Sequence, residues 1–170
     1  MTADADPRDE LRAAIDRLSD QHALMLREWA RMLNREAEFA ERRSASPLAD
    51  MLGVQSESVE PGRSRFRFTA QAGWHNPHGV LHGGVIYIMV DSSMGAAVMA
   101  GLEPGETCAT IELKISYLLP VREGDLVADT EVVKQGRNIA FAESKVTDER
   151  GRLVATASGS MFIVRAASTA

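Results

Sequence analysis

Hydrophobic residues recur at two different spacings along the chain, and the change of spacing divides it in two. Between residues 6 and 43 they follow one another every three or four positions, which is the period of an amphipathic helix. Asp6 can cap such a helix, and Pro7 suits its first position. The pattern predicts a helical arm over residues 6–43, ended by Ser44-Ala-Ser-Pro47. The apolar positions of this arm are Leu11, Ile15, Leu18, Met25, Trp29, Met32 and Leu33.

From Gly53 onward the period is two, which is typical of half-buried strands. Residues 63–68 alternate arginine with serine or phenylalanine, and two strands are predicted before residue 71. The turn residues Gln135-Gly-Arg-Asn138 predict a hairpin. Four further strands are predicted over residues 111–117, 126–132, 139–146 and 153–164.

The segment Gly83–Leu102 is apolar on nearly every side and carries one charge, that of Asp91. It has the length of a membrane span, but a carboxylate at its middle costs about 2.5–3.5 kcal/mol in a bilayer. A helix buried in a globular domain is the better interpretation. Small residues on one face of the later strands would let a sheet approach this helix closely. They are Ala140, Ala142, Ala155, Ala157 and Gly159. We therefore predict an α+β fold, a curved antiparallel sheet wrapped around one helix.

Composition narrows the possible functions. The chain has 170 residues, 45% of them hydrophobic, and a net charge of −5, unlike the basic surface of nucleic-acid-binding proteins. Its one cysteine, Cys108, excludes an intramolecular disulfide and a multi-cysteine metal site, and no base at a recognisable spacing makes it a nucleophile. No basic segment followed by an apolar run opens the chain, so no secretory signal is predicted and the cytoplasm is the expected location.

The chemistry is concentrated in Trp74-His-Asn-Pro-His-Gly-Val-Leu-His-Gly-Gly-Val-Ile-Tyr-Ile-Met-Val-Asp91. At a helix start, Gly83 and Gly84 would present unpaired amides that a ligand can approach closely. Such amides can hold a carbonyl oxygen that gains negative charge during acyl transfer. The same two glycines could instead serve only a tight turn.

Asp91 indicates a functional site more specifically than the two glycines do, because a carboxylate on an apolar helix is costly to desolvate without a partner or a chemical task. It is either structural, bonded to Ser92, to Ser93 or to a neighbouring cap, or a nucleophile or general base for water. A rise of ~1.5 Å per residue places it about 12 Å from Gly83, whereas reacting groups must lie within roughly 3–3.5 Å. If both act in one reaction, Asp91 must come from a second chain, as in a twofold dimer.

Asn76 and His82 could either contact a substrate carbonyl or fix the loop. His75, His78 and His82 could suggest a metal site with Asp91, but their spacing matches no helical ligand motif. No metal and no cofactor are predicted.

The spacing Asn76-x5-His82-Gly83-Gly84-x6-Asp91 resembles the signature of hotdog-fold acyl-CoA thioesterases of the phenylacetic-acid-degradation (PaaI-like) type. The resemblance continues through Ile115-Ser-Tyr-Leu-Leu-Pro120 and through Val133-Lys-Gln-Gly-Arg137 with Ala140-Phe141, and it spans about residues 50–165. It implies a six-stranded sheet around one helix, a homodimer whose two sheets join, and often a homotetramer.

The resemblance also implies roles for single residues. Asp91 would be the catalytic carboxylate, and the Gly83 amide of the other subunit would polarise the thioester carbonyl. Asn76 and His82 would assist, and Thr110 would position water.

Two of the implied assignments have alternatives. Strand alternation places Thr110 on the same face as Glu112, so either the strand bends at its start or Thr110 is an ordinary surface residue. Lys134 and Arg137 flank the Gly136 turn, where cations would meet the phosphates of the coenzyme A nucleotide, or they simply belong to a solvated hairpin.

These observations together predict a cytoplasmic acyl-CoA thioesterase, with residues 1–48 as an N-terminal helical extension and residues 49–170 as the hotdog domain. Asp91, Gly83, His82, Asn76 and Thr110 are the expected catalytic residues. The expected substrate-binding residues are Gly84, Lys134, Gly136 and Arg137. Two alternatives remain, a non-catalytic acyl-CoA-binding module and a hydroxyacyl-thioester dehydratase on the same fold.

Overall fold

The structure is a computed structural model that describes residues 6–20, 22–23, 26–27, 30 and 46–165. The chain divides into two units between residues 43 and 44. In the first unit, α1 (Pro7–Ile15) is capped by Asp6, which accepts the Arg8 N–H, and it buries no residue. The predicted continuous helix over residues 6–43 is wrong. A turn follows Ile15, and the Ser19 hydroxyl accepts the backbone N–H of His22, which favours a new helix start over continuation. The predicted apolar positions Met25, Trp29, Met32 and Leu33 lie outside the described residues.

The second unit opens with a short helix, α4 (Pro47–Leu52), where the sequence predicted only the end of the arm. Ser46 accepts the backbone N–H of Ala49, and Pro47 occupies the first helical position, so these residues begin a helix instead. Gly53 ends it with a φ of 85°, a backbone conformation that glycine adopts most readily. α4 spans the predicted boundary at residue 48, and its Ala49 and Leu52 belong to the hydrophobic core.

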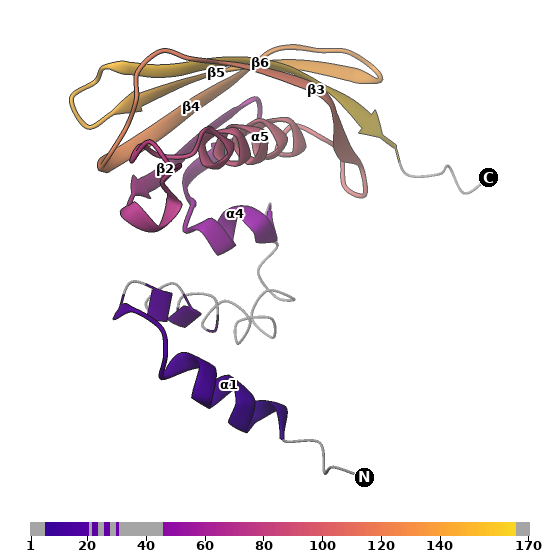
Figure 1. Cartoon of the computed structure of the whole chain (residues 1–170). Coiled ribbons are helices and arrows are strands. Elements are labelled where there is room, and N and C mark those ends of the chain that lie inside the picture. The colour runs from indigo at the N-terminus through magenta and orange to yellow at the C-terminus, as the bar shows by residue number, and fades with distance from the viewer. Residues whose placement is uncertain (1–5, 21, 24–25, 28–29, 31–45, 166–170) are drawn as a thin grey trace. The chain divides into compact units, whose positions relative to one another are not determined.

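A six-stranded antiparallel sheet in the order β1-β2-β4-β5-β6-β3 makes up most of this unit. It arches over one long helix, α5 (Gly83–Met99), as Figure 1 shows. The 3₁₀ turn η1 (Ala72–Trp74) lies in the connection that leads into α5. The strands are β1 (Gln55–Glu60), β2 (Arg63–Ala70), β3 (Thr107–Tyr117), β4 (Gly124–Gln135), β5 (Ile139–Asp148) and β6 (Leu153–Val164). The predicted fold, two strands, a buried helix and four further strands, is confirmed.

The close approach of the sheet to α5 depends on small residues, as predicted. Ala140 and Ala155 are fully buried on the inner face of the sheet. A Cβ on Gly159 would lie 3.1 Å from Sδ of Met94, which is itself fully buried on α5. The same Cβ would lie 3.0 Å from the carbonyl oxygen of Glu112 on β3, so a side chain at position 159 would have to displace both neighbours by a few tenths of an ångström.

Four buried hydroxyl groups fasten α5 to the sheet. The Ser93 hydroxyl lies 2.7 Å from that of Ser64 on β2 and 2.8 Å from that of Thr130 on β4. The Thr130 hydroxyl in turn donates to Ser144 on β5 at 2.9 Å. Because every member has a partner, the network fixes the rotation and the axial position of α5 under the sheet.

In the described part of the chain, no helix combines the length and the apolar character needed to cross a membrane.

Candidate active site

One side of α5 is left uncovered by the described residues of its own unit. Its residues that are not fully buried are spaced three or four apart, so they form a single stripe along the helix. We call this the open stripe; it consists of Gly83, Gly84, Tyr87, Ile88, Asp91, Gly95 and Met99. Asp91 stands at its middle, half-buried, and β3 runs beside it as an edge strand of the sheet.

Asp91 is paired with Thr110 of β3. The Thr110 hydroxyl donates to Oδ1 of Asp91 at 2.8 Å. The contact is possible because the pairing of β3 with β6 shifts between Thr110 and Glu112, which makes Ile111 an extra residue in the strand. A bulge of this kind restarts the alternation of side chains. Of the two alternatives for Thr110, the structure therefore shows the irregular strand, and Thr110 faces the helix.

The structural alternative for Asp91, a hydrogen bond to Ser92 or Ser93, is not observed among the described residues. The Ser93 hydroxyl is engaged in the buried network on the opposite side of α5. Since Thr110 bonds only one carboxylate oxygen, Oδ2 of Asp91 stays available on the open stripe.

The start of α5 separates the roles of its two glycines. His82 is the N-cap residue, and its Nδ1 accepts the backbone N–H of Gly84 at 2.9 Å. A neutral imidazole that accepts at Nδ1 carries its proton on Nε2, so the exposed edge of His82 is a donor. Within the described chain the N–H of Gly83 has no partner. Gly83, not Gly84, therefore supplies the free amide at the positive end of the helix.

Asn76 organises the loop in front of the helix. Its Oδ1 accepts the backbone N–H of His78 at 2.9 Å, and its own backbone N–H donates to the carbonyl of Val80 at 2.8 Å. The loop is also anchored by Nε2 of His75, which lies 2.6 Å from the carbonyl oxygen of Arg122. With its oxygen occupied, the half-buried Asn76 keeps its NH₂ group as a free donor among the described residues.

Tyr117, the last residue of β3, also contacts the helix start, a role that its place in the sequence does not predict. Its hydroxyl donates to the carbonyl oxygen of Gly83 at 2.8 Å. Burial of the phenol, with a smaller contribution from the nearby Tyr87, raises its pKa above the usual value of 10.0. The group therefore stays protonated, and remains a donor, across the neutral pH range. An alternating strand pattern identifies Tyr117 as a strand residue but does not indicate this contact.

The hairpin between β4 and β5 lies at the other end of α5. Nε2 of Gln135 donates to the carbonyl of Gly101, just beyond the helix, at 3.4 Å. The Gly136 N–H closes the predicted turn. Lys134 and Arg137 are exposed, and neither forms an ion pair within the described residues. Within one chain the structure therefore does not bring these cations to the Gly83 amide.

The remaining reactive groups do not extend the site. Burial, and to a smaller extent the charge of Asp91, raise the pKa of the Cys108 thiol above 9.0, which disfavours the reactive thiolate. Among the described residues, no group of three His, Cys, Asp or Glu side chains is placed to hold a metal ion.

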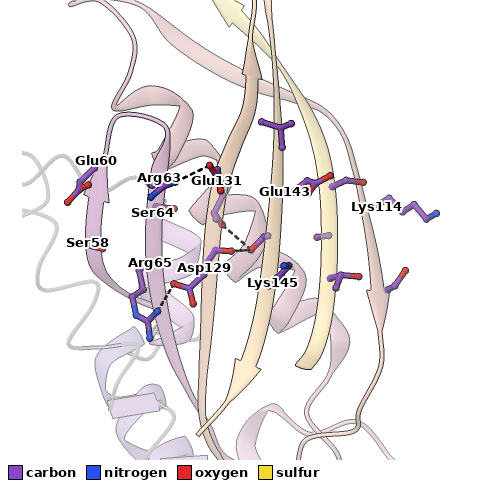
Figure 2. A pocket seen from close by; sticks show the side chains of 17 residues that line it. Ser58, Glu60, Arg63, Ser64, Arg65, Lys114, Asp129, Glu131, Glu143 and Lys145 are labelled. Carbon is purple, nitrogen blue, oxygen red and sulfur yellow. Dashed lines mark hydrogen bonds and ion pairs between the residues drawn. The ribbon is translucent and has the colours of Figure 1, made fainter. Parts of the chain in front are cut away.

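A groove of about 740 Å³ crosses the outer face of the sheet, away from α5 (Figure 2). It is lined by charges of both signs, which partly neutralise one another, as in the pair of Arg63 with Glu131 at 3.1 Å. The buried partners of these strands, Ser64 and Thr130, point the opposite way, toward Ser93 of α5. The groove and Asp91 therefore lie on different sides of the sheet, and the groove is not part of the candidate site.

Comparison with known proteins agrees with this architecture. The family model of the thioesterase superfamily matches residues 78–155. Human acyl-coenzyme A thioesterase 13 is 30% identical over 58% of this chain and 71% of its own length. The 1,4-dihydroxy-2-naphthoyl-CoA hydrolase of Listeria monocytogenes is 27% identical over 63% of this chain and 87% of its own. A phenylacetic acid degradation-related protein from Ralstonia eutropha has a crystal structure that superposes with a TM-score of 0.63, at 30% identity over 68% of this chain and 88% of its own. With the hotdog architecture in place, this chain belongs to the thioesterase superfamily.

Proposed function

We propose that this thioester hydrolase acts in the cytoplasm, where it cleaves an acyl-CoA into the free acid and CoA. Each active site is shared by two identical subunits. The observation that carries the proposal is the separation of two complementary groups along α5. Gly83 offers a free amide at the helix start, and Asp91 offers a carboxylate on the same open stripe. Eight steps of ~1.5 Å each along one rigid helix place them about 12 Å apart, too far to act on one carbonyl group.

The edge strand β3 supports a shared site. Its start carries Thr110, which holds Asp91, and its last residue is Tyr117, which contacts Gly83. If two copies of β3 pair antiparallel about a twofold axis, the Tyr117 end of one strand lies beside the Thr110 end of the other. Each Gly83 amide then faces Asp91 of the partner subunit. Ile111, which is 55% exposed on this edge, would be covered in such a dimer. The proposed assembly is a homodimer that can pair further into a homotetramer.

The chemistry follows from the donors and the acceptor. The Gly83 N–H, at the positive end of the helix dipole, stabilises the oxygen of the thioester carbonyl as it becomes negative. His82 and Asn76 contribute the further donors of this loop. Asp91 of the partner subunit, held by Thr110, either takes a proton from water as the water oxygen bonds to the carbonyl carbon, or attacks that carbon itself. In the first route the C–S bond then breaks, and the CoA thiolate takes up the proton that Asp91 accepted from water. In the second route the C–S bond breaks as Asp91 becomes acylated, and a water molecule then hydrolyses this mixed anhydride, which releases the acid, restores the Asp91 carboxylate and supplies the proton for the CoA thiolate. No step calls for a cofactor.

Coenzyme A as the leaving group is supported by the two free cations of the β4–β5 hairpin, Lys134 and Arg137, which suit phosphate groups. The names of the human and Listeria relatives also specify CoA thioesters. Reversal of both charges, in Lys134→Glu/Arg137→Glu, should raise KM for an acyl-CoA and leave KM for the matching acyl-pantetheine unchanged. An equal effect on both substrates would remove the hairpin from CoA binding.

A thiol-trapping assay on acetyl-, hexanoyl-, palmitoyl- and phenylacetyl-CoA tests the proposed function. We expect CoA release by the wild-type protein and none by Asp91→Asn, which keeps the size of the side chain. Loss of water with the thioester intact would identify a dehydratase, and binding without turnover would identify a binding module. A single turnover in ¹⁸O-water then separates the two routes, because label enters the Asp91 carboxylate only if Asp91 attacks the carbonyl.

Mixed dimers test the sharing of the site. Asp91→Asn subunits and Gly83→Pro subunits, each inactive alone, are refolded together in equal amounts. Half of the dimers are then mixed, and one of the two sites in each is intact, so activity should return to about a quarter of the wild-type value. Recovery of none would place both groups in one chain and refute the shared site.

A further inference from the structure

We infer that Tyr117 holds the oxyanion-stabilising amide of Gly83 in place, through one hydrogen bond and one ring contact to this residue. The inference rests on the proposed function and adds to it a positioning residue, one that acts through Gly83 and does not itself touch the substrate. Tyr117 belongs to β3, so it ties the helix start to the sheet from outside the loop that precedes the helix.

The ring contact explains why glycine suits position 83. A Cβ built on Gly83 would lie 2.9 Å from Cζ of Tyr117, closer than real Cβ atoms approach a neighbour. The face of Gly83 that would carry a side chain is thus already occupied by the phenol. By contrast, a Cβ on Gly95, one turn beyond Asp91 on the open stripe, would meet nothing within 4 Å.

The hydrogen bond compensates for the freedom that glycine brings. Glycine has the widest range of backbone conformations, and the first residue of a helix has no helical hydrogen bond to its own N–H. An oxyanion donor, however, is effective only when its direction is fixed before the reaction. The Tyr117 hydroxyl fixes the carbonyl of Gly83, and the cap formed by His82 fixes the amide of Gly84. Both restraints act on the peptide group between Gly83 and Gly84. The Gly83 N–H belongs to the preceding peptide group, whose carbonyl, that of His82, accepts the backbone N–H of Val85 at 3.0 Å. With the peptide groups on both sides of its Cα held, Gly83 has little freedom to turn its N–H away from the substrate.

The chain provides a matched control, because it contains only two tyrosines. Tyr87 lies one turn into α5, close enough to influence the pKa of Tyr117, and its hydroxyl makes no hydrogen bond within the described residues. Tyr117→Phe and Tyr87→Phe therefore remove the same atom from neighbouring rings, and only the first removes the bond to Gly83.

We expect Tyr117→Phe to lower kcat about tenfold, a fraction of the 10²–10³-fold effect of losing an oxyanion donor outright, with KM within twofold of wild type. Tyr87→Phe should match wild type in both constants. Tyr117→Leu, which also removes the aromatic ring, should lower kcat further, and thermal unfolding of all three variants checks that each is folded.

An infrared measurement separates positioning from general structural damage. In the Asp91→Asn background, hexanoyl-CoA labelled with ¹³C at the carbonyl binds without turnover, and a hydrogen bond from Gly83 shifts its carbonyl band to lower frequency. Adding Tyr117→Phe should return the band toward that of free hexanoyl-CoA, and adding Tyr87→Phe should not. Equal kcat values and equal bands for the two variants would overturn this inference while the proposed function stands. A wild-type protein that releases no CoA from any of the four thioesters would overturn the proposed function, and this inference with it.

Discussion

Replacing Gly83 by proline removes a single hydrogen from the proposed active site with little change to the helix. Gly83 is the first residue of α5, where the N–H has no helical partner and proline is well accommodated. His82 before it has φ −64° and ψ 127°, which is the extended conformation that a residue preceding proline requires. The helix therefore tolerates the change, while the donor is lost.

The steric part of this substitution needs its own control, because proline also adds a Cβ. That atom would stand 2.9 Å from Cζ of Tyr117. Gly83→Ala adds the same Cβ and keeps the N–H, so the comparison of proline with alanine measures the replacement of the N–H by the ring carbon Cδ. Removal of one oxyanion donor costs about 10²–10³-fold in kcat, or ~2.7–4 kcal/mol. We expect this ratio between the alanine and the proline variants.

The assay is CoA release at saturating acyl-CoA, measured for wild type, Gly83→Ala and Gly83→Pro, with unfolding temperatures recorded for each. Alanine should lie between the other two, because the ring of Tyr117 must shift to admit the new carbon. If alanine and proline were equally active, the Gly83 N–H would play no part in stabilising the carbonyl oxygen, and the shared site would lose one of its two halves.

Three further outcomes are expected. Thr110→Val should lower kcat about tenfold, because it releases Asp91, whereas Thr110→Ser keeps the hydroxyl and should stay near wild type. Steady-state kinetics measure both, and an equal loss of kcat in the two variants would mean that the Thr110 hydroxyl does not position Asp91. Ser93→Ala should lower the free energy of unfolding by ~1–3 kcal/mol, because it leaves the buried hydroxyls of its neighbours without a partner. Urea titration measures the free energy of unfolding, and an unchanged midpoint would contradict the prediction. Hydrogen bonding from Arg67 is the largest reason that the pKa of Glu57 lies below its usual 4.5. A carboxylate whose pKa falls on folding stabilises the fold above its unfolded pKa and loses that contribution as the pH falls through the folded value. Glu57→Gln should therefore flatten the decline of stability below about pH 4.5, and an unchanged slope in acid-unfolding curves would count against the ion pair.

The sequence predicts the second unit well because its patterns are set by burial. Arg63 and Phe66 fall on opposite faces of β2 as the period of two requires. The long apolar segment forms α5, because a helix packed under the sheet can bury apolar residues around most of its circumference. These elements are specified by local composition, and a single chain suffices to recognise them.

The predictions that were wrong or left open have a different physical origin. Thr110 faces the helix because Ile111 is an extra residue in the pairing of two strands, and a bulge depends on the partner strand as well as on the local sequence. The helix at Pro47 could have been recognised from Ser46, a capping residue followed by proline. The arm failed for a third reason, because α1 buries no residue and its helical period has no core against which to extend.

For the candidate site, the sequence names candidate residues but does not divide the roles among them. In the sequence, Gly83 and Gly84 offer two equivalent amides. Only the position of the His82 ring shows that one of them is already hydrogen-bonded. The contact of Tyr117 joins residues 34 positions apart, so no local pattern could indicate it. Roles of this kind are set by tertiary contacts, and the sequence could identify the candidates without ranking them.

The hydrogen bonds that hold α5 in place also bear on the proposed second subunit. Ser93 fixes the helix to two strands from one side, and Tyr117 and Thr110 fix it to β3 from the other. Neither a sliding nor a bending motion that preserved these bonds could bring Asp91 to the Gly83 amide of its own chain. The bonds that orient each half of the site therefore also keep the two halves apart, and the proposed antiparallel pairing of the β3 edges would join them with every bond intact.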